Sequence, residues 1–145
     1  MCQETKVQVV RLMALRPNNW TINRAKLERV RAAWRCGAQE RLPPVLLAEI
    51  DGELSLIDGH SRAYAAYEHG QTHILARVED LAQIEGSTAL YTHIHRAGPA
   101  MVVRPIADRT IADLAGRIVS PRDHRRLWVG YCTRWLEENE RQVCQ

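Results

Sequence analysis

The chain has 145 residues, 46% of them hydrophobic, which suffices for one compact domain with a core but is too short for two full domains. Its net charge of +3, from 20 Lys and Arg against 17 Asp and Glu, is too balanced to indicate nucleic-acid binding by the whole molecule. No stretch approaches the length of a membrane span, and residues 1–6 lack the apolar core of a signal peptide. We therefore expect a cytoplasmic protein with no membrane partner.

The first well-specified element is a helix over residues 25–36. Asn23 can cap its N-terminus and Gly37 can close it. Its apolar stripe, which should dock on a sheet, consists of Leu27, Val30 and Trp34. Its basic residues are Arg24, Lys26, Arg29, Arg31 and Arg35, and a second basic group is formed by Arg122, Arg125 and Arg126. Helical spacing spreads such charges around the cylinder, so we interpret them as solvated, with DNA contact as the alternative.

A β-hairpin is predicted next. Residues 43–50 have the composition of a strand, Asp51-Gly52 is a strong two-residue turn signal, and residues 53–57 form the returning strand. Asp58 directly follows the second strand of this hairpin.

The run from Ile57 to Ala66 is the segment best suited to chemistry, because it joins a strand to a helix through a small polar corner. The first N–H groups of a helix lack partners within it and lie at the positive end of its dipole, so such a corner binds anions. Gly59 lets a ligand approach the backbone, and Arg62 can add donors suited to phosphate. The alternative is a tight turn in which Asp58 or Ser61 caps the helix and Arg62 is solvated.

The helix after this corner, rich in helix formers over residues 63–69, is predicted to end at Gly70, and residues 73–78 form another strand. The order strand, hairpin, strand, corner, helix, strand predicts an α+β fold. Residues 80–97 look helical up to a stop at Gly98-Pro99, with an interruption allowed at Gly86-Ser87. The residues available for burial there are Ile84, Tyr91 and Ile94. Residues 101–103 are a short strand or a packed loop.

The last third of the chain contains two helix starts. Thr110 to Asp113 form a capping box that opens a helix to about Ile118, and Ser120-Pro121 opens another. The final helix has a broad apolar stripe of Leu127, Trp128, Tyr131, Cys132, Trp135 and Leu136. We expect this stripe to pack on the core, with a homodimer seam as the alternative.

No metal site is predicted. The cysteines, Cys2, Cys36, Cys132 and Cys144, form no Cys-x-x-Cys pair, so free thiols are expected. His93 and His95 lie on a predicted helix, where a two-residue spacing points them to different faces.

Between about Val7 and Val78 the sequence resembles the ParB/sulfiredoxin superfamily, in the order P-x-V, strand, D-G, strand, G-H-x-R, small-residue helix, G, strand. Residues 9–18 are similar to its opening strand and Pro-Asn turn. The resemblance implies a small mixed sheet with packed helices over residues 1–80. Beyond it, the sequence itself predicts a mainly helical extension over residues 81–145, packed on this core. The superfamily includes partitioning proteins that bind CTP, sulfiredoxins that use ATP, and free-serine kinases.

The corner from Asp58 to Arg62 is most similar to the Asp-Gly-His-x-Arg corner of the free-serine-kinase branch. Sulfiredoxins have Gly-Cys-His-Arg, with a nucleophilic cysteine that is missing after Gly59. Partitioning proteins continue into DNA-binding and dimerisation domains, for which we expect no room. The kinases also use an acidic residue near the early Pro turn, which here reads Pro17-Asn18-Asn19-Trp20.

These features predict a protein that binds a nucleotide or a small phosphorylated ligand, with ATP, ADP or CTP and magnesium as the cofactors considered. The predicted phosphate-binding residues are Gly59, His60, Ser61 and Arg62; Asp58 is the candidate catalytic base or magnesium ligand, and Asn18, Asn19 and Trp20 are candidate substrate contacts. Catalysis as a small-molecule phosphotransferase is left open. The alternatives are a non-catalytic interaction module and a DNA-associated ParB-like protein of nuclease type, although a nuclease usually needs several carboxylates.

Overall fold

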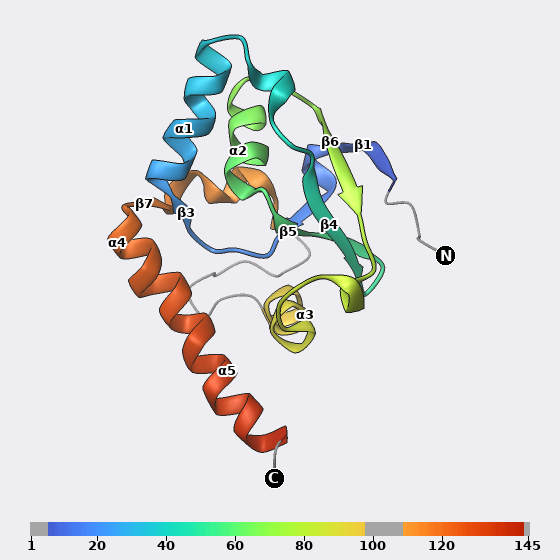
Figure 1. Ribbon diagram of the computed structural model, residues 1–145, viewed down its shortest axis with the longest axis vertical. Helices are drawn as coiled ribbons and strands as arrows, with labels where there is room; N and C mark the ends of the chain where they lie inside the picture. Colours follow the sequence, from blue (N-terminus) through green and yellow to red (C-terminus); the bar gives the residue numbers. More distant parts are fainter. Residues whose placement is uncertain (1–5, 98–108, 144–145) are drawn as a thin grey trace.

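The computed structural model describes residues 6–97 and 109–143, and it shows an α+β fold around a five-stranded mixed sheet (Figure 1). The strands are β1 (Val7–Arg11), β2 (Leu15–Pro17), β4 (Val45–Ile50), β5 (Glu53–Asp58) and β6 (His73–Val78). Their order across the sheet is β1-β6-β4-β5-β2. The β1–β6 and β4–β5 pairs are antiparallel, while β4–β6 and β2–β5 are parallel.

The predicted hairpin is confirmed. Asp51 has φ 54° and Gly52 has φ 80°, and these two positive values are what a tight two-residue turn between twisted strands requires. The turn joins β4 to β5 in antiparallel register, with Ile50 opposite Glu53. The register shifts between Leu46 and Leu47, so the end of β5 near Asp58 lies beside an irregularity in β4.

The α-helices are α1 (Arg24–Arg35), α2 (His60–Glu68), α3 (Thr88–Ala97), α4 (Pro121–His124) and α5 (Gly130–Val143). The 3₁₀ helices are η1 (Leu12–Ala14), η2 (Gln39–Arg41), η3 (Leu81–Gln83) and η5 (Ile111–Arg117). A π-helical turn, η6 (Arg125–Val129), joins α4 to α5. The predicted cap of α1 is confirmed, because the Asn23 side chain accepts a hydrogen bond of 3.0 Å from the Ala25 N–H. The helix α2 begins at His60 and therefore includes Ser61 and Arg62, while Asp58 ends β5 and Gly59 lies between the two elements.

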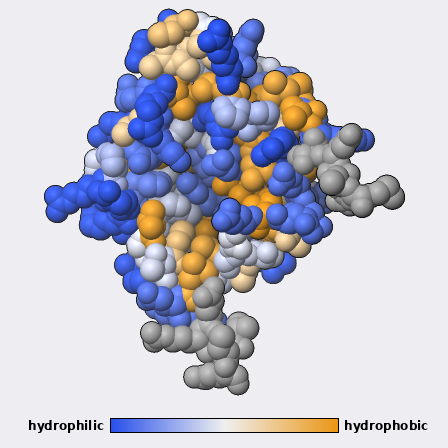
Figure 2. Space-filling view, viewed as in Figure 1, coloured by the Kyte–Doolittle hydropathy of each residue, from blue (hydrophilic) through white to orange (hydrophobic). Residues whose placement is uncertain are grey.

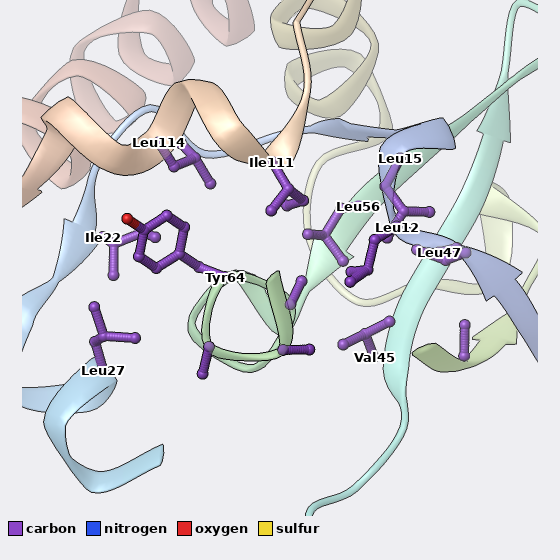
Figure 3. Close-up of a cluster of buried hydrophobic side chains, with 14 residues drawn as sticks. Leu12, Leu15, Ile22, Leu27, Val45, Leu47, Leu56, Tyr64, Ile111 and Leu114 are labelled. Atoms are coloured by element: carbon purple, nitrogen blue, oxygen red, sulfur yellow. The ribbon is translucent and has the colours of Figure 1, made fainter. Parts of the chain in front are cut away.

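The main core surrounds α2, which packs between the sheet, α1 and η5 (Figure 3). Its alanines at positions 63, 65 and 66 are buried, and their small side chains let the helix lie close to the sheet. Figure 3 shows Tyr64 of α2 beside Ile22 and Leu114, and Leu56 of β5 beside Ile111. Because His60 and residues 63–66 of α2 are buried, packing sets the position of its first turn.

The predicted helix over residues 80–97 is partly wrong. Only η3 and α3 are helical, and the backbone between them includes Gly86 at φ 116°, which is incompatible with an α-helix. The interruption lies at the Gly86-Ser87 position that the sequence had indicated. The predicted stop at Gly98-Pro99 and the segment 101–103 lie outside the described residues.

The capping box at Thr110 is confirmed, but it opens the 3₁₀ helix η5 rather than an α-helix. After η5, the strand β7 (Ile118–Val119) pairs in parallel with β3 (Ile22–Asn23). Two-residue strands show no alternation of apolar and polar residues, so this pairing was not predictable from sequence.

The segment from α4 to α5 forms a rod that leads away from the sheet (Figure 1). Its apolar stripe meets a second hydrophobic cluster, in which Trp20, Leu90, Ile94 and Trp128 are buried and Tyr131, Cys132, Trp135 and Leu136 are partly buried. The stripe thus packs against α3 and Trp20, while the homodimer seam stays a prediction. Among the described residues, no helix is long and apolar enough to cross a membrane.

Candidate functional site

The polar corner places the start of α2 next to open space. Gly59 occupies the N-cap position with φ 105° and ψ 27°, and no side chain caps the helix. The first helical hydrogen bond runs from the Ala63 N–H to the Gly59 carbonyl at 2.9 Å, so the N–H groups of His60, Ser61 and Arg62 precede it. The capping role considered for Asp58 or Ser61 is therefore wrong.

Gly59 is required for a steric reason as well as for its backbone conformation. A Cβ atom at this position would lie 2.6 Å from Val45 Cγ1 and 3.0 Å from Arg62 Nη2. A left-handed φ also strains any residue with a side chain. The close approach of β4 to the corner therefore explains the glycine, independently of any ligand.

His60 has a well-defined tautomer. Its Nε2 accepts hydrogen bonds from the N–H groups of Asn18 and Asn19, both at 3.0 Å, so in the neutral ring the proton is on Nδ1. Burial, helped by the nearby charges of His124, Lys26 and Arg62, lowers the pKa of His60 to about 3. The ring is thus a permanent neutral donor whose Nδ1–H has no hydrogen-bond partner among the described residues.

Arg62 is fixed rather than solvated. Its Nη1 donates to the carbonyls of Pro43 and Pro44 at 2.8 and 3.0 Å, and its Nη2 donates to Asp58 Oδ2 at 3.2 Å. The Asp58 side chain is 67% exposed, whereas that of Arg62 is 17% exposed. The guanidinium therefore ties the corner to the segment that leads into β4, and its charge stays at the mouth of the site.

A cleft of about 370 Å³ opens in front of this corner. It is lined by Asn19, Thr21, Ile22, Asn23, Lys26, Arg29, Val30, Leu42, Ile57, Asp58, Gly59, His60, Ser61, Arg62 and His124. Three of these residues are Lys or Arg, and Asp58 is the one carboxylate among them, so the cleft favours an anion. In Figure 2, hydrophilic residues dominate the side of the molecule on which α1 and α4 lie.

The structure brings together some of the predicted site residues and separates others. The corner residues and Asn19 line the cleft, but Asn18 and Trp20 do not. The Asn18 side chain is buried, and it donates to Ser55 Oγ at 2.9 Å and to the Tyr91 carbonyl at 3.0 Å. Trp20 lies in the second cluster, with its ring 4.9 Å from that of Trp128. The predicted substrate contacts of Asn18 and Trp20 are corrected accordingly.

Sequence reasoning missed the residues that form the other wall of the cleft. Lys26 and Arg29 of α1 line it while they remain exposed, so the predicted solvated basic face is confirmed for these two and also forms part of the cleft. Their three-residue spacing, which places them on one side of the helix, was the available signal. His124 of α4 also lines the cleft, where its Nδ1 lies 2.7 Å from Thr21 Oγ1. The two residues are 103 positions apart, and no local pattern links them.

The remaining histidine and cysteine predictions concern separate places. His93 Nε2 lies 2.9 Å from the Tyr131 hydroxyl, and His95 Nε2 lies 3.3 Å from Glu53 Oε1, so the two rings have different partners. Among the described residues, no group of three or more His, Cys, Asp or Glu side chains could hold a metal ion. Cys36 and Cys132 are free thiols, while Cys2 and Cys144 lie outside the described residues.

No protein-family model and no curated protein matches the chain. Among solved structures, the chain is similar to a conserved hypothetical protein from Pyrococcus furiosus, with a TM-score of 0.46 and 22% identity over 58% of this chain and 36% of that one. A protein from Agrobacterium tumefaciens gives a TM-score of 0.46 and 20% identity over 75% of this chain and 61% of that one. The sulfiredoxin of Arabidopsis thaliana gives a TM-score of 0.40 and 18% identity over 50% of this chain and 85% of that one. The chain thus spans less than two thirds of the first two proteins, and these likenesses concern the fold alone.

Proposed function

We propose that the cleft binds the phosphate group of a nucleotide or of another small phosphorylated molecule. The observation that carries this proposal is the uncapped N-terminus of α2, which opens into a basic cleft at Gly59. Unpaired N–H groups and the positive end of the helix dipole both favour an anion at this point.

His60 supports the same ligand through an independent observation. The ring is buried and lines the cleft, and its Nδ1–H is left as a donor because two backbone N–H groups engage Nε2. Its lowered pKa keeps it neutral above about pH 3, so its donor capacity does not depend on protonation in the physiological range. Lys26 and Arg29 add charge from the opposite wall.

The size and lining of the cleft favour an organic phosphate over the bare ion. The volume of about 370 Å³ lies at the lower end of the range typical for small-molecule sites. Four aliphatic side chains contribute to the lining: Ile22, Val30, Leu42 and Ile57. They offer an apolar surface for a base or another organic group. With Asp58 as the one carboxylate in the lining, magnesium would arrive bound to the nucleotide.

The experiment is isothermal titration calorimetry of ATP, ADP, CTP and pyrophosphate, each with and without magnesium. The variant K26Q/R29Q removes the two α1 cations, and R35Q on the same helix is the matched control because Arg35 does not line the cleft. We expect the double variant to bind about 10- to 100-fold more weakly, the scale of a lost charge-assisted hydrogen bond, and R35Q to bind as the wild type does.

Two results would contradict the proposal. One is the absence of binding for every nucleotide and for pyrophosphate in the wild-type protein. The other is equal affinity in K26Q/R29Q and R35Q, because the ligand would then lie elsewhere.

A further inference from the structure

Thr21 and His124 form a hydrogen-bonded pair on the wall of the cleft. Thr21 is buried with 3% exposure, and its Oγ1 lies 2.7 Å from His124 Nδ1. Both residues line the cleft together with His60 and the start of α2. The pair therefore shares one cavity with the donors assigned to phosphate.

The fold holds this pair in place from both sides. Thr21 immediately precedes β3, and the parallel pairing of β3 with β7 brings the C-terminal segment to the cleft. Ser120 follows β7 and caps α4 by accepting a hydrogen bond of 3.1 Å from the Asp123 N–H. His124 is thus the last residue of a short capped helix, and its ring is directed by Thr21.

The hydrogen bond distinguishes the two ring nitrogens. When Nδ1–H donates to Thr21 Oγ1, Nε2 has a free lone pair that can accept a proton. His124 Nε2 has no hydrogen-bond partner among the described residues. The Thr21 hydroxyl can accept as well as donate, so this contact allows the tautomer with the proton on Nδ1, and a histidine in that tautomer can act as a general base through Nε2.

We propose that His124 Nε2 accepts the proton of a hydroxyl group, from water or a small alcohol, that attacks the terminal phosphoryl group of a nucleoside triphosphate held at the start of α2. This inference rests on the proposed phosphate site. A bond forms between the hydroxyl oxygen and the terminal phosphorus, and the bond from that phosphorus to the bridging oxygen breaks. The nucleoside diphosphate leaves with the electron pair, and the proton moves to His124. Thr21 is a positioning residue.

The charges around His124 suit this role. The titratable groups that line the cleft with it are Lys26, Arg29, Asp58, His60 and Arg62, and its neighbours in the chain include Arg122, Asp123, Arg125 and Arg126. Burial lowers the pKa of His124, and Lys26 lowers it further. The ring is therefore neutral at pH 7 and is ready to accept a proton. The rate of phosphoryl transfer should therefore decrease only below pH 6.5, where the ring of His124 becomes protonated.

The chain contains a matched control pair. Thr72 Oγ1 lies 2.8 Å from His73 Nδ1, so the contact is the same, but both residues are exposed and neither lines the cleft. The experiment measures phosphate release from ATP and magnesium, and phosphate transfer to glycerol by ³¹P NMR, from pH 5 to 8. The proteins compared are wild type, H124Q, T21V, T21S and the control H73Q, and the affinity for ATP is measured for each.

We expect H124Q to lose about 100-fold or more of the wild-type rate, as for a missing general base, while its Kd for ATP changes by less than about twofold. The acid limb of the pH profile should vanish in H124Q. T21V should lower the rate and shift the acid limb of the pH profile. T21S should restore the wild-type rate and acid limb, and H73Q should match the wild type in both.

Three results would overturn the inference. In the first, H124Q folds and keeps the wild-type rate and pH profile. In the second, H124Q fails to fold and T21V keeps the wild-type rate and profile. In the third, the wild-type protein binds ATP but neither releases phosphate nor phosphorylates glycerol, and the proposed phosphate site then stands without this chemistry. If ATP and the other nucleotides do not bind, the proposed function itself fails.

Discussion

The two hydrophobic clusters of this protein differ in composition and in burial. The cluster around α2 is mainly aliphatic, with alanines on the helix, and members such as Leu56 and Val45 are completely buried. In the cluster around α3 and α5, half of the side chains are aromatic, and half are only partly buried. The candidate site lies at the first cluster. A ligand site that depends on the position of one helix start therefore lies at the more fully buried of the two clusters.

Buried polar atoms without a hydrogen-bond partner occur in both regions but are more numerous near the second. Trp34 Nε1 lies at the first cluster, whereas Trp20 Nε1, His95 Nδ1 and two guanidinium nitrogens of Arg109 lie near the second. At the corner, both the His60 ring and the Arg62 guanidinium make two or more hydrogen bonds. Buried polar groups without partners cost free energy, so the region near α3 is expected to be the less stable of the two.

Matched leucine truncations should produce the largest difference between the clusters. Leu56→Ala removes a fully buried side chain and should lower the free energy of unfolding by about 2–5 kcal/mol. Leu136→Ala removes a partly buried side chain of the second cluster and should cost about 1 kcal/mol. Urea denaturation measures both. Equal losses would show that the second cluster is as tightly packed as the first.

Acid should destabilise the protein chiefly through His60. Its folded-state pKa of about 3 lies below the unfolded value of 6.5, so the folded protein binds fewer protons than the unfolded chain. The stabilisation is present above pH 6.5 and is lost as the pH falls toward 3, by about 1.4 kcal/mol per pH unit. Between pH 6.5 and 5 the free energy of unfolding should therefore decrease by about 2 kcal/mol.

Two glutamine variants assign this effect to one cluster. His60→Gln keeps an acceptor for the two backbone N–H groups but does not titrate, so the pH dependence should flatten. His93→Gln, beside the second cluster, should leave most of the pH dependence in place, although burial also lowers the pKa of His93. A steep pH dependence in His60→Gln would contradict the account of the buried ring.

Local patterns were sufficient to predict the frame of the site. Asp51-Gly52 predicted the hairpin because few residues tolerate two successive positive φ angles, and the Asn23 cap predicted the start of α1. The end of β5 at Asp58, the turn at Gly59 and the start of α2 at His60 could also be predicted from the sequence, because each depends on neighbouring residues.

The opposite wall of the cleft depends on contacts distant in sequence. His124 reaches Thr21 because β3 and β7, two residues each, pair although they lie far apart in the sequence. Asn18 and Trp20 flank Asn19, yet their side chains turn into the interior, and only the packing of α3 and α5 decides this. Sequence periodicity carries no information on contacts between residues that are distant in sequence, and for this reason the predicted substrate contacts were partly wrong.

The most direct test of the phosphate site is amide NMR spectroscopy of the protein during titration with pyrophosphate. The account predicts that the largest chemical-shift changes occur at the N–H groups of His60, Ser61 and Arg62, which precede the first hydrogen bond of α2. These changes should saturate with the same Kd as calorimetry and should shrink in K26Q/R29Q. Unchanged amide signals at these three residues at a saturating pyrophosphate concentration would contradict the central claim.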